Sequence, residues 1–154
     1  MKQPNKCILL SNISMHLNFM INYYDHLKPI MTIEAFCKEN IIGISLEQIG
    51  DILSCVREAI SNIEEHAYTE EFPGMVHIIC NYKNNNTLVI TVIDNGCGIK
   101  NIEQAFQSGW SSKEGFPGMG FSVMDSLCDE FEVSSSISDK GTKVIMTFKV
   151  GLND

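Results

Sequence analysis

Apolar residues along this chain recur at two different spacings, and each spacing predicts a different kind of element. Between residues 45 and 68 they return every three or four positions and form one wide apolar face, which predicts a long amphipathic helix. Ser45 and Gln48 have the spacing of a capping box, which places the start of this helix. The apolar positions are Leu46, Ile49, Ile52, Leu53, Val56, Ala59, Ile60 and Ile63.

Other stretches alternate with a period of two and predict strands. The first covers residues 16–23, where Leu17, Phe19, Ile21 and Tyr23 fall on one face. Residues 75–82 and 87–94 predict a hairpin, because the asparagines between them tolerate the left-handed backbone of a tight turn. Residues 131–138 and 142–150 predict two further strands.

Shorter helices are predicted at residues 27–39, 101–109 and 120–131, the second of them ending at Gly109. Hairpins outnumber strand–helix–strand alternations in this order of elements. We therefore expect an α+β fold, a two-layer α/β sandwich in which a mixed, mainly antiparallel sheet is covered on one face by helices. Residues 1–14 are expected to form an N-terminal extension or edge strand, and residues 15–154 a single domain.

Composition narrows the classes of partner. The 154 residues carry a net charge of −8 and one arginine, Arg57, which argues against a nucleic-acid-binding surface. A nucleotide is not excluded, because backbone N–H groups and Mg²⁺ can hold its phosphates. The six cysteines show no C-x-x-C spacing, so we expect buried, reduced thiols rather than disulfides or a zinc site. No signal peptide or membrane-spanning run is found, so a cytoplasmic protein is expected.

Polar residues form a stripe along one side of the long helix. Glu58, Asn62 and His66 follow one another at intervals of one helical turn. The stripe fits a solvated helix edge. It also fits a phosphoryl-transfer site, in which an Asn62 oxygen binds Mg²⁺ and the Glu58 carboxylate accepts a proton.

Two glycine-rich loops offer a place for a nucleotide. Asp94 ends a strand and is followed by Gly96 and Gly98, a pattern typical either of a turn or of a carboxylate that accepts from the amino group of adenine. We expect Cys97, between these glycines, to be a small apolar filler.

In the second loop, Gly118 and Gly120 precede an apolar helical pattern and leave N–H groups unpaired, as in a phosphate cradle or a simple helix start. Lys113 is the nearest cation to that loop. Thr142, which follows Gly141, could assist Asp94 or belong to a tight turn.

The segments EAISNIEEHAY, DNGCGI, GMGFSVM and KGT, taken in this order, resemble the N-box, the two glycine boxes and the closing Gly-Thr of the Bergerat-fold ATPases. Within that superfamily the chain looks most like the bacterial anti-sigma factor serine kinases. This resemblance is also carried by HAY and by the tail EFEVSSSISDKGTKVIMTF.

The resemblance implies an ATP-binding kinase domain that binds ATP or ADP with Mg²⁺ and phosphorylates a serine of an anti-sigma-factor antagonist. A sigma factor as second partner and a homodimer are also implied, with no direct contact to nucleic acid or membrane. Glu58 matches the catalytic base, Asn62 the Mg²⁺ ligand and Asp94 the adenine-reading acid. The expected cofactor-binding residues are Asn62, His66, Asp94, Gly96, Gly98, Ile99, Lys113, Gly118, Met119, Gly120, Phe121 and Thr142.

Two alternatives stay open. The segment between Ser112 and Gly118 lacks the arginine that the family would have there. A non-catalytic or switch-type module that binds ATP or ADP and regulates a partner by shape would tolerate this loss. An interaction protein that keeps the fold but binds no nucleotide is the other alternative.

Overall fold

Five strands form one sheet in the computed structural model, which describes residues 12–21, 26–83, 85–107, 120–135 and 140–151. The strands lie in the order β1-β2-β3-β5-β4, and each pairs with its neighbours in antiparallel orientation. The expected α+β sandwich is confirmed, and among the described strands the sheet is antiparallel throughout rather than mixed. The strands are β1 (Ile13–Met20), β2 (Met75–Lys83), β3 (Thr87–Asp94), β4 (Glu130–Ser135) and β5 (Thr142–Lys149).

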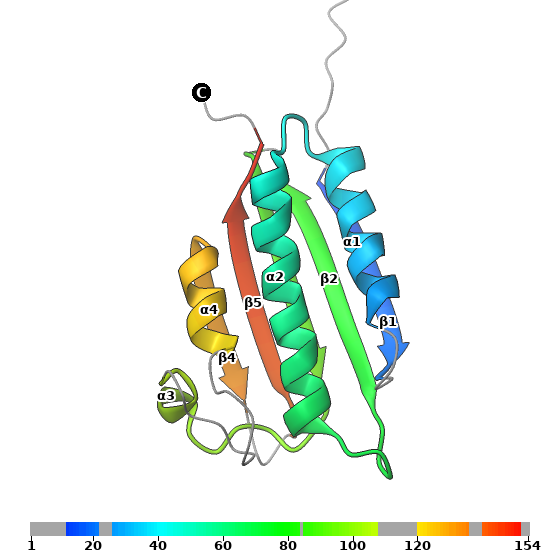
Figure 1. The fold of residues 1–154 in the computed structure, drawn as a ribbon, viewed down its shortest axis with the longest axis vertical. Helices are drawn as coiled ribbons and strands as arrows, with labels where there is room; N and C mark the ends of the chain where they lie inside the picture. The colour runs from blue at the N-terminus through cyan, green and yellow to red at the C-terminus, as the bar shows by residue number, and fades with distance from the viewer. Residues whose placement is uncertain (1–11, 22–25, 84, 108–119, 136–139, 152–154) are drawn as a thin grey trace, which may run out of the picture.

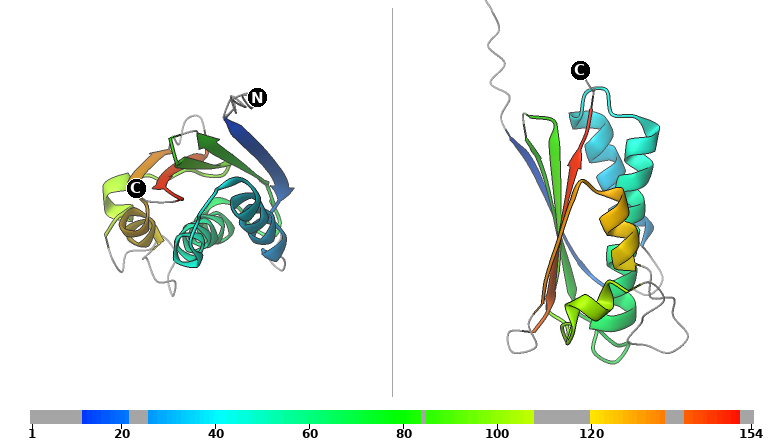
Figure 2. Two further views of the ribbon diagram at one scale, coloured as in Figure 1. Left: turned by 90° about the horizontal axis from the view of Figure 1, so that it is seen from above. Right: turned by 90° about the vertical axis from the view of Figure 1, so that its left-hand side faces the viewer.

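Helices cover one face of this sheet (Figures 1 and 2). They are α1 (Leu27–Asn40), α2 (Leu46–Asn62) and α4 (Gly120–Leu127), with α2 between the other two. The opposite face carries no helix of the described chain (Figure 2). A π-helical turn, η1 (Ile63–Ala67), extends α2, and the short helix α3 (Ile102–Ala105) lies beside the end of β4.

The capping box at the start of α2 is confirmed. The Gln48 N–H donates to Ser45 Oγ, and the Ser45 N–H donates to Gln48 Oε1, each at 3.0 Å. This reciprocal pair satisfies two N–H groups that would otherwise lack partners at the helix start. It therefore sets the start of the helix that later carries Glu58 and Asn62.

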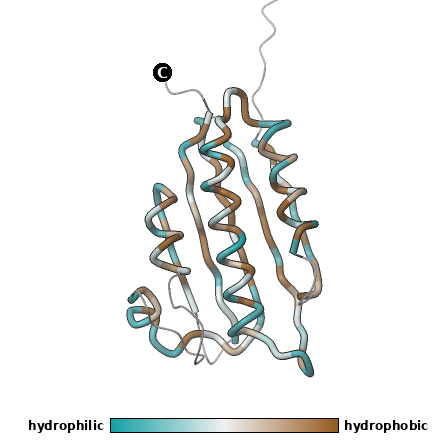
Figure 3. The backbone as a smooth tube through the Cα atoms, viewed as in Figure 1, coloured by the Kyte–Doolittle hydropathy of each residue, from teal (hydrophilic) through white to brown (hydrophobic). Residues whose placement is uncertain are grey.

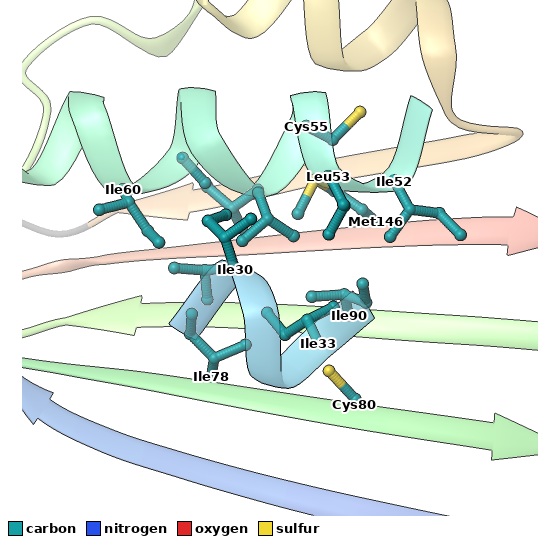
Figure 4. Close-up of a cluster of buried hydrophobic side chains, with 14 of the residues drawn as sticks. Ile30, Ile33, Ile52, Leu53, Cys55, Ile60, Ile78, Cys80, Ile90 and Met146 are labelled. Carbon is teal, nitrogen blue, oxygen red and sulfur yellow. The ribbon is translucent and has the colours of Figure 1, made fainter. Parts of the chain in front are cut away.

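The core lies between the helices and the sheet. Apolar positions run along the central strands and recur along the helices (Figure 3). Ile33 of α1 and Ile52 and Ile60 of α2 lie above Ile78 of β2 and Ile90 of β3, all of them 0–1% exposed (Figure 4). This packing fixes α2 against the sheet, and so fixes the side chains at its end.

Element boundaries differ from the prediction where pairing or packing decides them. Strand β1 starts at Ile13 and ends at Met20, because it pairs residue for residue with β2 from Tyr82 back to Met75. Residues 13 and 14 therefore belong to the sheet, whereas Tyr23 lies outside the described residues. Helix α4 ends at Leu127, because the chain turns to enter β4 at Glu130. Helix α3 ends at Ala105, and Gly109 lies outside the described residues.

Three cysteines lie in the core as expected. Cys37, Cys55 and Cys80 are buried free thiols, and burial raises their pKa values to about 11, 12 and 12. They are therefore protonated at neutral pH and act as small apolar side chains. Among the described helices, none is long and apolar enough to cross a membrane.

Candidate functional site

A cavity of about 400 Å³ opens at the end of the sheet where α2 ends. Its walls come from α2 and η1, from the loop after β3, from α3 and from the first residues of α4 and β5. Part of the lining is apolar, as a flat base would require. The lining residues are Ala59, Asn62, Ile63, His66, Ala67, Val92, Asp94, Cys97, Gly98, Ile99, Lys100, Asn101, Gln104, Ala105, Gly120, Phe121, Thr142 and Val144.

Asp94 is the buried acid of this cavity. It ends β3 opposite Thr142 of β5 and is 5% exposed. Its Oδ1 accepts a hydrogen bond from the Gly96 N–H at 2.8 Å. Burial raises the pKa of the Asp94 carboxyl, and backbone hydrogen bonds from Gly96 and Thr142 offset part of that shift. A buried carboxylate at a cavity wall can accept a hydrogen bond from a ligand's amino group.

The raised pKa predicts how stability depends on pH. A group whose folded pKa is raised contributes stability below its unfolded pKa, and that contribution is lost as pH rises through the folded pKa. We therefore expect the wild type to become less stable relative to Asp94→Asn as pH rises from about 4 towards neutrality. The quantity compared is the free energy of unfolding of the two proteins. Urea unfolding of both proteins across this range measures the difference. A difference that rises over the same range would contradict the shift.

The loop after Asp94 is fastened to the end of the long helix. The Cys97 N–H donates to the Ala67 carbonyl at 3.3 Å, and the Cys97 thiol donates to the His66 carbonyl at 3.0 Å. Cys97 is exposed and lines the cavity, so the general expectation of buried cysteines is wrong at this position. A side chain at Gly96 would lie 2.5 Å from the Ala67 carbonyl oxygen, so only glycine permits this close approach.

Ser135 fastens the other side of the same loop. Its Oγ accepts from the Ile99 N–H at 2.7 Å, donates to the Gly141 carbonyl at 2.9 Å and lies 3.1 Å from Thr142 Oγ1. No sequence pattern distinguishes Ser135 from the serines around it. Only the pairing of Ser135 with Thr142 across β4 and β5 shows that it faces the loop.

Asn62 and Gly120 meet in the lining of the same cavity. A Cβ added to Gly120 would lie 2.8 Å from Asn62 Nδ2 and 3.0 Å from Asn62 Oδ1. The polar stripe and the second glycine loop, which are far apart in sequence, are thus in contact. Glu58 lies one helical turn before Asn62 and is half-buried, but it is not among the described residues that line the cavity.

Gly120→Ala is expected to displace Asn62 without harming the fold. The added methyl group meets the far end of a flexible side chain, and alanine favours a helix over glycine. If Asn62 holds Mg²⁺, the increase in ADP affinity on adding Mg²⁺ should shrink by about tenfold in the variant. Titration calorimetry with and without EDTA measures this increase. Gly50→Ala is the matched control, since nothing lies within 4 Å of a Cβ added at Gly50 of α2. An unchanged Mg²⁺ effect in Gly120→Ala would contradict the assignment.

The remaining predicted residues fall into three groups. His66, Gly98, Ile99, Phe121 and Thr142 line the cavity, whereas Gly96 stands behind it and donates to Asp94. The His66 Nε2 lies 3.6 Å from Glu65 Oε2. Lys113, Gly118 and Met119 lie outside the described residues.

Aromatic packing holds the start of α4 against the cavity. Phe121 lies with its ring centroid 5.5 Å from that of Phe106 and 6.0 Å from that of Phe131. Phe106 and Phe131 are themselves 5.5 Å apart. The three rings connect the end of α3, the start of α4 and strand β4. Their packing therefore holds Gly120 and Phe121 in position at the cavity wall.

The lining of the cavity matches the chemistry of an adenine base, and it offers one candidate oxygen ligand for Mg²⁺. A buried carboxylate and apolar walls match a purine that carries an amino group. The described residues include no group of three or more His, Cys, Asp or Glu side chains that could hold a metal. Mg²⁺ commonly takes only one or two protein ligands beside phosphate and water, and Asn62 offers one such oxygen.

Comparisons with known proteins agree with this geometry. The family of histidine kinase-like ATPase domains matches residues 24–148. The anti-sigma F factor of Clostridium acetobutylicum is 36% identical over 140 residues, which cover 90% of this chain and 94% of the relative. The anti-sigma F factor of Thermoanaerobacter pseudethanolicus is 35% identical over 139 residues, which cover 89% of this chain and 94% of the relative.

Solved structures support the fold. The RsbU and RsbW domains of Rv1364c from Mycobacterium tuberculosis match with a TM-score of 0.61 and 18% identity, over 92% of this chain and 33% of that one. The histidine kinase domain of the blue-light activated histidine kinase EL346 from Erythrobacter litoralis matches with a TM-score of 0.53 and 19% identity, over 80% of this chain and 58% of that one. The chain therefore belongs to the histidine kinase-like ATPase domain family and, within it, to the family of anti-sigma F factors.

Proposed function

We propose that this protein is an ATP-dependent protein-serine kinase and anti-sigma factor that regulates transcription by switching between partners. The observation that carries the proposal is the buried Asp94 carboxylate in the wall of a cavity that is also lined by Asn62 and Gly120, which are in contact. The family and the names of the relatives support the same reading. In this proposal the ligand is ATP or ADP with Mg²⁺.

At the base end of the site, Asp94 accepts a hydrogen bond from the amino group of adenine. Its Oδ1 is already held by the Gly96 N–H, so the carboxylate is fixed before the nucleotide binds. The loop bonds of Cys97 and Ser135 keep Ile99 and Gly98 in place beside it. A site that is ordered in advance loses less entropy on binding.

At the phosphate end, Asn62 would hold Mg²⁺ through its side-chain oxygen, and N–H groups at the start of α4 would donate to the phosphates. Bound Mg-ATP supplies the phosphoryl group that is transferred. Glu58 accepts the proton of the substrate serine hydroxyl as the serine oxygen bonds to the γ-phosphorus and the bond to the β–γ bridging oxygen breaks. Its carboxylate, one turn from Asn62, would be reached by a serine that enters from outside the cavity.

The proposed partners follow from the relatives and from the resemblance of the motifs. One is an anti-sigma-factor antagonist that offers the serine, and the other is a sigma factor that the protein sequesters.

We also propose a homodimer. The helix-free face of the sheet supports this, because no helix of the described residues covers half-buried Ile79, Ile93 and Ile145 there. Light scattering at micromolar concentration tests the oligomeric state.

The direct test of the function is transfer of labelled phosphate from γ-labelled ATP to a purified antagonist protein from the same genome. We expect a labelled antagonist whose phosphate maps to one serine, and no label when that serine is replaced by alanine. Label that appears on a histidine of this chain, or no label on any antagonist, would reject the serine kinase.

A non-catalytic nucleotide-binding module is the second candidate. The observation in its favour is the shortage of cations, because Arg57 is exposed on α2 and Lys113 is the only basic residue of segment 108–119. Few positively charged groups would then stabilise the negative charge that develops on the phosphoryl group in the transition state. Tight binding of Mg-ADP in calorimetry, together with no transfer to the antagonist, would favour this module over the kinase.

A further inference from the structure

Tyr68 joins three segments that meet behind the cavity. It directly follows the π-helical turn η1, and its hydroxyl donates to the Met75 carbonyl of β2 at 2.9 Å. The same hydroxyl oxygen accepts the Asn95 N–H at 2.7 Å. Asn95 is the residue after Asp94, so one side chain connects the end of the long helix, the start of β2 and the loop that follows the adenine-reading acid.

The hydroxyl is suited to both bonds at once. Burial raises the pKa of the Tyr68 hydroxyl, so it keeps its proton and can donate while its oxygen accepts. The N–H of Asn95 is thereby satisfied on the side away from the cavity. Without that partner this N–H would bond to water instead, and the loop next to Asp94 would lose one of its links to the end of the long helix.

The sequence makes room for the Tyr68 ring in an unusual way. Gly74 lies directly against the ring, and a Cβ added there would be 2.0 Å from its Cε1 atom. The ring therefore packs on bare backbone next to Met75, which brings the hydroxyl within reach of the Met75 carbonyl. The aromatic ring and the glycine form one unit whose effect is to place a hydroxyl under the loop.

We propose that Tyr68 is a positioning residue for adenine recognition, acting through Asn95 on the Asp94 carboxylate. This inference rests on the proposed function, because it takes Asp94 as the group that reads the amino group of adenine. Tyr68 touches no ligand in this role, since it is absent from the described lining of the cavity. It fixes where the carboxylate points.

Tyr68→Phe tests the inference, because it keeps the ring and removes only the hydroxyl. The readout is the ratio of ADP to IDP affinity in calorimetry, since hypoxanthine lacks the amino group that Asp94 would accept from. We expect ADP affinity to fall by about three- to tenfold, as for the loss of one hydrogen bond, and IDP affinity to stay close to that of the wild type. In the kinase assay the KM for ATP should rise while kcat stays the same.

Tyr82→Phe is the matched control. Its hydroxyl donates to Asn86 Oδ1 at 3.1 Å, at the opposite end of β2, so its loss should leave both affinities unchanged. Gly74→Ala is a second variant that keeps the hydroxyl but displaces the ring, and it should lower the same ratio. Circular dichroism at the assay temperature, well below the unfolding midpoint, confirms that each variant is folded.

The outcomes separate this inference from the proposed function. If Tyr68→Phe lowers ADP and IDP affinity equally, or lowers neither, Tyr68 has only a structural role and the inference is wrong. If the wild type itself binds no ADP, or binds IDP as tightly as ADP, adenine recognition by Asp94 fails first. A lower ADP-to-IDP ratio in both Tyr68→Phe and Gly74→Ala, with Tyr82→Phe unchanged, supports the inference.

Discussion

We expect transfer of phosphate to the antagonist to fall by about 10²- to 10⁴-fold in Glu58→Gln, the range that a positioned general base contributes. Glutamine keeps the size of the side chain but cannot accept the serine proton. ADP affinity should stay close to that of the wild type, because Glu58 lies outside the described lining of the cavity. Single-turnover transfer of labelled phosphate, together with calorimetry on the same protein, measures both quantities.

Glu47→Gln is the matched control for that variant, because Glu47 is an exposed acid in the first turn of the same helix. It should transfer phosphate at the rate of the wild type. Normal transfer by Glu58→Gln would remove the base from the proposed mechanism. A parallel loss of ADP affinity would instead place Glu58 in nucleotide binding.

Asp94→Asn should lower ADP affinity by about 10- to 100-fold, the cost of leaving buried polar groups unpaired. The amide is nearly isosteric, but its NH₂ group donates where adenine also donates. Because Asp94 is 5% exposed, water cannot easily take the place of the lost acceptor. Calorimetry with ADP gives the change in affinity, and thermal unfolding shows that the variant is folded.

Asp125→Asn serves as the control, since Asp125 is an exposed acid on α4. It should bind ADP like the wild type. ADP affinity that is unchanged in Asp94→Asn would show that the base does not rest on this carboxylate, and the cavity would then need a different ligand.

The order of elements and the long helix could be predicted from the sequence, because both depend on local spacing. The capping box of Ser45 and Gln48 involves residues of one helical turn, so the pattern alone places it. The limits of β1 could not be predicted in the same way. They follow from pairing with β2, more than fifty residues later, which extends the strand back to Ile13.

The candidate site shows the same division. Asp94, Asn62 and Gly120 were selected by motif, and the structure brings Asp94 and the Asn62–Gly120 contact to one cavity. Ser135, Cys97 and Tyr68 were missed as supports of the site, because their hydrogen bonds reach residues 27 to 36 positions away. Such contacts exist only once the sheet and helices are assembled. The roles assigned to Glu58 and Asn62 stay predictions.

Side chains along β3 point alternately to the two faces of the sheet, and this alternation determines how an insertion in the strand would affect the site. Leu88, Ile90, Val92 and Asp94 all point to the helix-covered side, because each is two residues from the next. Inserting one residue within the strand would turn the Asp94 carboxylate to the helix-free side, together with the strand side chains between the insertion and Asp94. A one-residue insertion in this strand should therefore remove Asp94 from the cavity unless a β-bulge absorbs the extra residue.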